Sequence, residues 1–267
     1  MAKKKRPENY EAYGAADAHA HVERAVFSDG VDQLLERAWK HGLSAIIAVA
    51  ADKVPTIFEE TRALAHRHER VWATAGIHPH YAQHHEILWD AMIAILDDPK
   101  VVAIGEFGLD YHYMNSPREI QREIMTRQLQ QALERQMPMV LHVREAFEES
   151  LEILDSFAPE HHGIVHCFSG NQAEAQAYLD RGFYLSIPGI VTFPKALDLH
   201  QAVRSCPVDR LLVETDCPYL APAPFRGRRN EPAYLAFTVE AVAKLKEMPV
   251  EQLARATWQN TRKVYGI

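Results

Sequence analysis

Eight short apolar runs, each followed by a helix-like segment, constrain the fold of this chain most strongly. Continuous apolar runs of this length are typical of strands that are covered on both faces. The runs cover residues 15–22, 43–50, 71–77, 101–107, 139–143, 163–168, 183–187 and 211–215. The segments with helical spacing cover residues 29–41, 53–67, 84–96, 117–136, 145–157, 171–181, 195–205, 231–246 and 250–265. Strict alternation predicts a parallel sheet, and eight units in about 250 residues predict an α/β fold, a (β/α)8 TIM barrel with an extra C-terminal helix.

The alternative architecture is an open, doubly wound sheet. Such a sheet would usually carry a glycine-rich nucleotide loop after its first strand, and no G-x-G-x-x-G motif follows the first run here. No linker, low-complexity stretch or long internal repeat divides the chain. We therefore expect residues 15–267 to form a single barrel domain, preceded by a flexible N-terminal extension over residues 1–14. The basic KKKR of that extension is either a solvated tail or a weak nucleic-acid contact.

Composition limits the partners and the compartment. The 267 residues carry a formal net charge of −7, whereas a protein that coats DNA nonspecifically would be basic. A polyanionic substrate must therefore be held locally, by a few arginines and by metal ions. The chain has no membrane-length apolar run and no secretory h-region, and its three cysteines lack metal-type spacing. We expect a cytoplasmic protein without a membrane span, and a monomer whose open rim could admit a strand end.

The first run, AADAHAHV, contains a pair of closely spaced histidines. In a strand, side chains at alternate positions share a face, so Asp17, His19 and His21 should all point the same way. Two imidazoles held side by side can bind one metal ion. The alternative is a strand whose two histidines face solvent.

Further candidate metal ligands occur at the carboxyl ends of other runs. In a barrel these ends meet on one rim, where active sites form. The candidate ligands are His19, His21, Glu106, His142, His166 and Asp216. Taken singly, the glutamate could pair with an arginine and either later histidine could be a core residue with a backbone partner. Their common position on one rim favours a metal centre.

Four imidazoles and two carboxylates are too many for one tetrahedral site with an open position, but they suit two divalent ions. Glu106 has two oxygens and is the natural bridge. His19, His21 and Asp216 would complete one ion, and His142 and His166 the other. Water activated by the ions is a nucleophile near neutral pH, and Asp216 can act as its general base. This chemistry is hydrolysis, but it leaves open phosphodiester, ester and amide bonds, and Zn, Mn and Mg as the metal.

Three loops could select the substrate. Arg226, Arg228 and Arg229 follow the eighth run and suit a phosphate backbone, although a solvated loop is the alternative. His78, His80 and the loop of Tyr111, His112 and Tyr113 could contact phosphate or stack on a base. These groups favour a phosphate-bearing substrate.

Six ordered motifs resemble those of a known family. They are DAHAHV, GIHPH, GEFGLDY, LHVREA, HCFSG and ETDCPYL…APAPFRGRRNEP. Together they resemble the TatD-type metal-dependent hydrolases of the amidohydrolase superfamily, from about Asp17 to the C-terminus. The resemblance implies a TIM barrel, a dinuclear site and a cytoplasmic Mg- or Mn-dependent DNase, with Zn as another plausible metal. It implies 3′→5′ exonuclease activity on single strands of DNA, and by extension of RNA.

The resemblance also implies residue roles. The six candidate ligands fall in its metal motifs, and His78 in G-x-H-P-H would be a catalytic or phosphate-binding residue. The expected catalytic residues are thus Asp216, Glu106 and His78. The expected substrate-binding residues are His80, Tyr111, Arg226 and Arg228.

Two other functions remain open. An ester or amide hydrolase, such as an aminoacyl-tRNA deacylase, would keep the metals and change the bond. A non-catalytic metal-dependent binding protein would have lost a ligand, and none of the expected ligands is missing.

Overall fold

The computed structural model describes residues 9–22, 30–157 and 161–267. Its strands are β1 (Ala16–Ala20), β2 (Ala45–Ala50), β3 (Val71–Ala75), β4 (Val101–Asp110), β5 (Met139–Arg144), β6 (Gly163–Val165), β7 (Tyr184–Ile187) and β8 (Leu211–Val213). Its α-helices are α1 (Val31–Lys40), α2 (Thr56–Arg67), α3 (His85–Ile93), α4 (Arg118–Arg135), α5 (Phe147–Asp155), α6 (Gln172–Asp180), α7 (Leu197–Ser205), α8 (Leu235–Leu245) and α9 (Val250–Tyr265).

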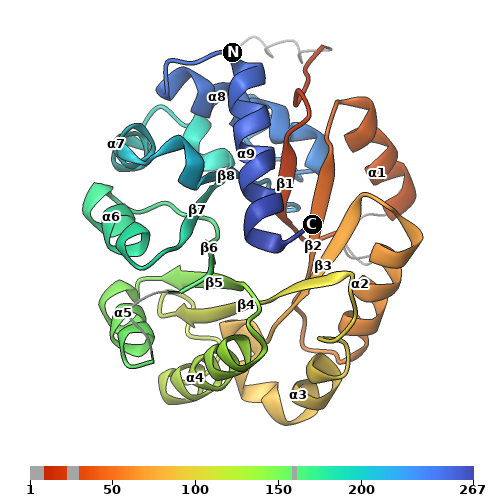
Figure 1. The fold of residues 1–267 in the computed structure, drawn as a ribbon, viewed down its shortest axis with the longest axis vertical. Helices are drawn as coiled ribbons and strands as arrows, with labels where there is room; N and C mark the ends of the chain where they lie inside the picture. The colour runs from red at the N-terminus through yellow and green to blue at the C-terminus, as the bar shows by residue number, and fades with distance from the viewer. Residues whose placement is uncertain (1–8, 23–29, 158–160) are drawn as a thin grey trace.

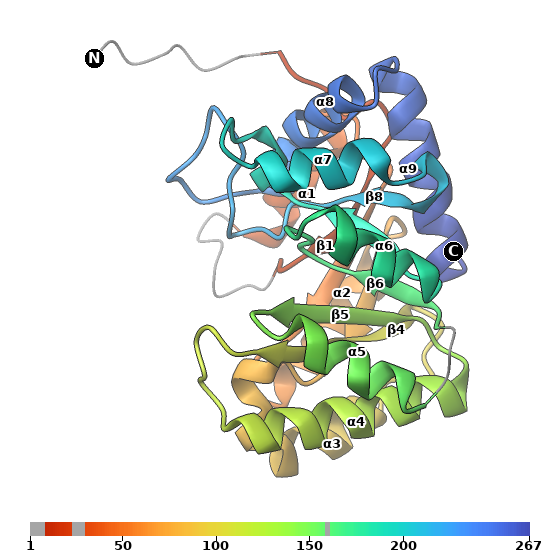
Figure 2. The same ribbon diagram turned by 90° about the vertical axis from the view of Figure 1, so that its left-hand side faces the viewer.

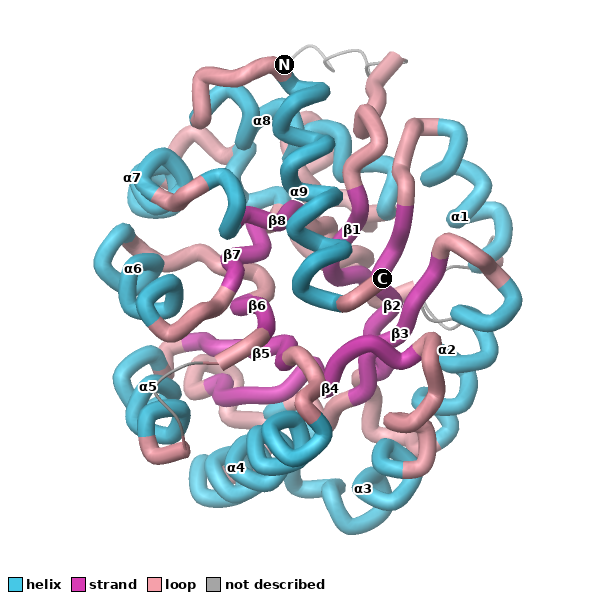
Figure 3. Tube along the Cα trace, in the orientation of Figure 1, coloured by secondary structure: helices cyan, strands magenta, loops and turns pink. Residues whose placement is uncertain are grey.

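The strands form one parallel sheet that curves into a barrel. Each strand pairs with the next in chain order, from β1 to β8. The helices surround the strands in Figure 1 and Figure 3. The ring is completed directly after β8, where the Asp216 N–H donates to the His19 carbonyl at 3.0 Å and the His21 N–H donates to the Cys217 carbonyl at 2.8 Å. The predicted (β/α)8 barrel is confirmed, and its closure brings the first and last ligand-bearing segments together.

The extra C-terminal helix closes one end of the barrel. Val264 and Tyr265 of α9 pack with inward-facing residues of the strands, among them Ile47 and Ile164. The Tyr265 hydroxyl donates to the Ala18 carbonyl at 3.1 Å. In Figure 2, α9 lies on the side of the barrel away from the long loop between β8 and α8. The carboxyl ends of the strands are therefore left for a functional site.

Two of the differences between the observed and the predicted strand boundaries change where expected ligands lie relative to the strand ends. β4 was expected to end at Phe107 but continues to Asp110, which lies opposite Arg144 of β5. Gly108 permits this close pairing, because a Cβ at its φ of +147° would overlap the His142 carbonyl oxygen. As a result, Glu106 lies within β4 rather than at its end. β6 is shorter than predicted, and His166 follows it directly.

Part of the expected flexible extension is held against the barrel. The Tyr10 ring stacks on the His41 ring with centroids 4.0 Å apart, and the Ala12 N–H donates to the His41 carbonyl at 2.8 Å. Apolar side chains of this segment, such as that of Ala12, are buried, whereas we expected the segment to be flexible. Residues 1–8, including KKKR, lie outside the described residues.

Among the described residues, no helix combines the length and the hydropathy that a membrane span requires.

Candidate metal centre

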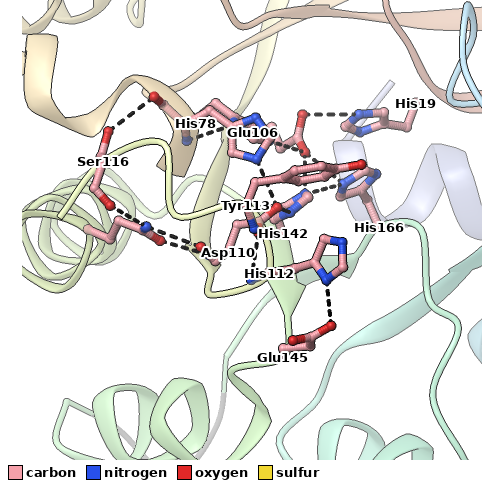
Figure 4. A network of polar contacts seen from close by, with 12 residues as sticks. His19, His78, Glu106, Asp110, His112, Tyr113, Ser116, His142, Glu145 and His166 are labelled. Atoms are coloured by element: carbon pink, nitrogen blue, oxygen red, sulfur yellow. Dashed lines mark hydrogen bonds and ion pairs between the residues drawn. The ribbon is translucent and has the colours of Figure 1, made fainter. Parts of the chain in front are cut away.

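The barrel gathers the predicted ligands around one buried carboxylate, Glu106, whose side chain is 2% exposed. Figure 4 shows His19, His78, His142 and His166 arranged about it. These side chains come from strands, or from residues directly after strands, that are far apart in sequence. The barrel brings these side chains together around Glu106.

One oxygen of Glu106 faces the first strand. Glu106 Oε2 lies 3.5 Å from His19 Nε2 and 3.4 Å from His21 Nε2. Asp216 Oδ1 lies 3.8 Å and 3.6 Å from the same two nitrogens. The side chains of His19, His21 and Asp216 thus form one group that could hold a metal ion.

The other oxygen faces the middle of the chain. Glu106 Oε1 lies 2.8 Å from His142 Nδ1 and 2.7 Å from His166 Nε2. His78 Nε2 lies 3.3 Å from the same oxygen, and His78, Glu106 and His142 form a second group of potential ligands. We expected His78 to act on substrate; its position makes it a potential ligand as well.

The donor set fits divalent cations. His19 Nε2 and Glu106 Oε2 are both fully buried and have no hydrogen-bond partner among the described residues. Buried polar atoms without partners are costly, so two such atoms facing one another indicate a missing shared partner. Imidazole nitrogens and carboxylate oxygens are suitable ligands for divalent ions such as Zn, and carboxylates also suit Mg and Mn.

Burial and neighbouring charges keep His19 neutral and Glu106 ionised, which are the forms that bind a metal ion. Burial lowers the pKa of His19 well below its usual value, so this imidazole is neutral at neutral pH. Burial opposes ionisation of Glu106, but His166 and His78 outweigh it and hold the pKa of Glu106 well below its ordinary range. Burial raises the pKa of Asp216 to about 7. The bridging group is thus an anion between imidazoles.

Two imidazoles near the other oxygen of Glu106, those of His78 and His166, have pKa values shifted in opposite directions. Burial lowers the pKa of His78 to about 4. Burial also opposes charge on His166, but the Glu106 carboxylate overcomes it and raises the pKa of His166 well above its usual value. Because a ligating imidazole must give up its proton at the metal-binding nitrogen, metal binding at His166 would release a proton.

A supporting carboxylate was missed by the sequence reasoning. Asp110 Oδ2 accepts from His80 Nε2 at 2.8 Å and lies 3.1 Å from His142 Nε2. Its Oδ1 accepts from the Tyr113 N–H at 2.9 Å. Asp110 therefore orients His142 with Nδ1 toward Glu106. The available signal was an aspartate that ends an apolar run, since a buried carboxylate requires such partners.

Two further buried carboxyls lie beneath the centre. Glu214 Oε1 accepts from the Cys167 N–H at 2.7 Å and lies 3.4 Å from His166 Nδ1. Asp17 accepts from the Thr215 N–H at 2.9 Å and from the Thr215 hydroxyl at 2.5 Å. Asp17 was expected to share a face with the two histidines; its hydrogen bonds tie β1 to the segment that carries Asp216.

The expected substrate residues are not all beside the centre. His80 is: its ring centroid lies 6.2 Å from that of His142. The Tyr111 ring instead packs against the hydrophobic core, with the Arg118 guanidinium 4.2 Å from its centroid. The Arg226 guanidinium lies 4.5 Å from the Phe193 ring centroid, and Arg228 is exposed in the loop after β8. The last two remain candidates for contacts made only by bound substrate.

An exposed aromatic residue lies closer to the centre than Tyr111. Tyr113 is 54% exposed, and its ring centroid is 5.3 Å from that of His80. The sequence reasoning included Tyr113 only as part of a loop. Tyr111 and Tyr113 are two residues apart, and this spacing alone does not predict which ring packs against the core.

Comparisons with known proteins agree with this architecture. The family model described as TatD related DNase matches residues 16–266. The "Uncharacterized metal-dependent hydrolase YabD" of Bacillus subtilis (strain 168) is 38% identical, covering 94% of this chain and 98% of the relative. The "3'-5' ssDNA/RNA exonuclease TatD" of Salmonella typhimurium is 35% identical over 94% of this chain and 98% of its own length.

A solved structure shows the same fold. The crystal structure of YJJV, a TatD homolog from Escherichia coli K12, superposes with a TM-score of 0.88 at 28% identity, covering 95% of this chain and 98% of that one. Family match, relatives and fold agree over nearly the whole chain. This chain belongs to the TatD-related DNase family of metal-dependent hydrolases.

Proposed function

We propose that this chain is a dinuclear metal-dependent deoxyribonuclease with 3′→5′ exonuclease activity on single strands. The observation that carries the proposal is the division of ligands between the two oxygens of Glu106, with His19 and His21 at one and His142 and His166 at the other. A carboxylate with imidazoles at both oxygens suits a bridge between two ions.

The chain's own residues would hold the ions in two sets. His19, His21 and Asp216 would hold one, and His142 and His166 the other, with Glu106 between them. His78 is placed to join the second set. Divalent ions at such a site supply positive charge that lowers the pKa of water and stabilises charge on a phosphoryl group.

Asp216 is suited to move a proton. Its carboxylate borders the first group, with Oδ1 3.8 Å from His19 Nε2 and 3.6 Å from His21 Nε2, so it lies where it could accept a proton from water held by the ions. Asp17 and Thr215 fix the backbone from which it projects. His80 is held by Asp110 through Nε2 at the edge of the centre, so Nδ1 of its imidazolium form can donate to a phosphate oxygen.

The substrate class rests on independent observations. One relative of similar length is named as an exonuclease of single-stranded DNA and RNA. Arg226 and Arg228 are exposed on the loop after β8, within an otherwise acidic protein of net charge −7. Because the protein as a whole is acidic, these two arginines would attract phosphates to this loop rather than to the whole surface. We further propose a cytoplasmic monomer, since an open rim must admit a strand end.

Labelled single-stranded DNA tests this function. With Mg²⁺ or Mn²⁺, the protein should shorten a 5′-labelled strand stepwise, and Asp216→Asn should slow the reaction by roughly 100-fold or more. A strand labelled at its 3′ end should release labelled mononucleotide first. If neither ion supports cleavage while the same preparation hydrolyses aminoacyl-tRNA or another ester, the deacylase alternative replaces the nuclease.

A further inference from the structure

We propose that a cavity beside His166, together with Arg144 and Tyr113, is a subsite for the unpaired base of the nucleotide that flanks the scissile phosphate. The inference rests on the proposed nuclease function and names a substrate contact for it. It predicts a requirement for a base that can leave its stack, and hence for single-stranded nucleic acid.

The cavity adjoins the metal centre. It has a volume of about 500 Å³ and lies between the segments that follow β5 and β6. His166 contributes to its lining, as do Cys167, Phe168 and Ser169. Because His166 also contacts Glu106, a group in this cavity would lie beside a phosphate held at the centre. The nucleobase, which is joined to the phosphate through the sugar, is the flat part of a nucleotide that can enter a partly apolar cavity.

Arg144 connects the cavity to the rim. It ends β5 two residues after His142, so the two side chains project from the same face of the strand. Arg144 lines the cavity, and its guanidinium carbon lies 4.7 Å from the Tyr113 ring centroid. Within the residues that the structure describes, it forms no ion pair with a carboxylate. A planar cation beside an exposed aromatic ring is suited to stacking on a base.

Tyr113 provides the second flat surface. Its ring is 54% exposed, with its backbone N–H anchored by Asp110 at 2.9 Å. The His80 and Tyr113 rings are nearly perpendicular, with an interplanar angle of 86° and centroids 5.3 Å apart. Exposed aromatic rings that are fixed in position stack on bases of any sequence.

The charges around the cavity select a base rather than a second phosphate. Glu145, Glu148 and Glu174 line it, together with the guanidinium of Arg144. Glu174 is engaged by the Asn171 N–H at 2.8 Å, and Glu145 by His112 Nδ1 at 2.7 Å. These carboxylates would repel a phosphate, whereas they can accept hydrogen bonds from the amino groups of bases. A phosphate would therefore bind at the metal centre rather than in the cavity.

Abasic substrates test the subsite. The wild type should bind and cleave a single strand with a base beside the scissile phosphate roughly 5- to 150-fold better than one with an abasic residue there, as expected for one stacked base. The abasic residue is placed at the terminal or the penultimate position, and at an interior position as the control substrate. Tyr113→Leu and Arg144→Gln should each reduce this preference toward 1, and Tyr113→Phe should preserve it.

The control variant is Arg262→Gln. Arg262 is another exposed arginine beside an aromatic ring, that of Trp258, but it lies on α9. It should keep the full preference for the base. Strand affinity is measured by fluorescence anisotropy alongside cleavage, so that binding and hydrolysis are read separately.

The outcomes separate the two proposals. If the wild type cleaves DNA but does not distinguish the abasic strand, or if Tyr113→Leu and Arg144→Gln keep its preference, the subsite is wrong and the nuclease stands. If the wild type prefers the base in binding but never cleaves, the subsite stands and the nuclease fails. If it neither binds nor cleaves a single strand, both are wrong.

Discussion

His19 Nε2 lies 3.5 Å from Glu106 Oε2, and neither buried atom has a hydrogen-bond partner among the described residues. The two atoms face each other across a space that Asp216 and His21 also border. A donor nitrogen and a carboxylate oxygen would ordinarily satisfy one another by direct contact. Their separation is explained by a cation that both would ligate.

Removing the charge of Glu106 should therefore reduce metal content. We expect Glu106→Gln to lower bound metal from about two ions per chain to one or fewer and to abolish hydrolysis, because an amide is a poor bridge. Elemental analysis after dialysis measures the content. Glu134→Gln is the matched control, since Glu134 is an exposed carboxylate on α4 that accepts a hydrogen bond from Gln130. An unchanged metal content in Glu106→Gln would contradict the bridging role.

Asp110 should set metal affinity without contacting metal. Its Oδ2 holds both His142 and His80, and an amide in its place can accept with only one atom. We expect Asp110→Asn to weaken metal binding roughly 10- to 100-fold, as is usual for the partner of a ligating histidine. Competition with a chelator measures this affinity. The control is Asp155→Asn, whose carboxylate pairs with Arg181 on the outer surface. Equal affinities in the two variants would show that Asp110 does not position His142.

The barrel and most of the centre could be predicted because they follow from short-range patterns. Apolar runs fix the strands, and ring closure follows from their number, so His19 and Asp216 meet although they are nearly 200 positions apart. The hydrogen bonds of Asp110 and the ion pair of Glu214 could not be predicted, because each depends on the rotation of a side chain inside the barrel. A carboxylic acid in an apolar run indicates that the buried group has polar partners, but it does not indicate which residues they are.

Loop geometry was the least predictable feature. Tyr111 and Tyr113 are equivalent in sequence terms, yet one ring packs into the core and the other is exposed beside His80. Both lie in the turn that follows β4, where the alternation of strand side chains does not apply. The role of His78 was similarly open, since a histidine after a strand can serve either metal or substrate.

The junction of β1 with β8 should contribute measurably to stability. The Thr215 hydroxyl donates to Asp17 Oδ2 at 2.5 Å and accepts from the Cys217 N–H at 3.2 Å. Thr215→Val removes the partner of Asp17 Oδ2 and of the Cys217 N–H. This loss should lower the free energy of unfolding by about 1–3 kcal/mol. Urea denaturation measures it. Thr257→Val is the control, because that buried hydroxyl donates only to carbonyls of its own helix. A loss no larger than in the control would contradict a tie across the junction.

An ion-pair cluster between α2 and the segment before β4 should make stability depend on acid pH. Burial opposes the charge of Asp98, but Arg62, the Lys100 N–H and His66 outweigh it and lower its pKa from 3.8 to about 2. A carboxyl with a depressed pKa in the folded state stabilises the fold above its unfolded pKa, and this stabilisation is lost as pH falls.

Asp98→Asn should therefore be less stable than the wild type near neutral pH, and the difference should shrink as the pH falls from 3.8 toward about 2. Chemical denaturation across this range measures the difference. Asp97→Asn is the neighbouring control; its side chain is 87% exposed and pairs with Arg135, so its effect near neutral pH should be smaller. A difference for Asp98→Asn that stays constant as acid is added would show that ionisation of this carboxyl is not what stabilises the cluster.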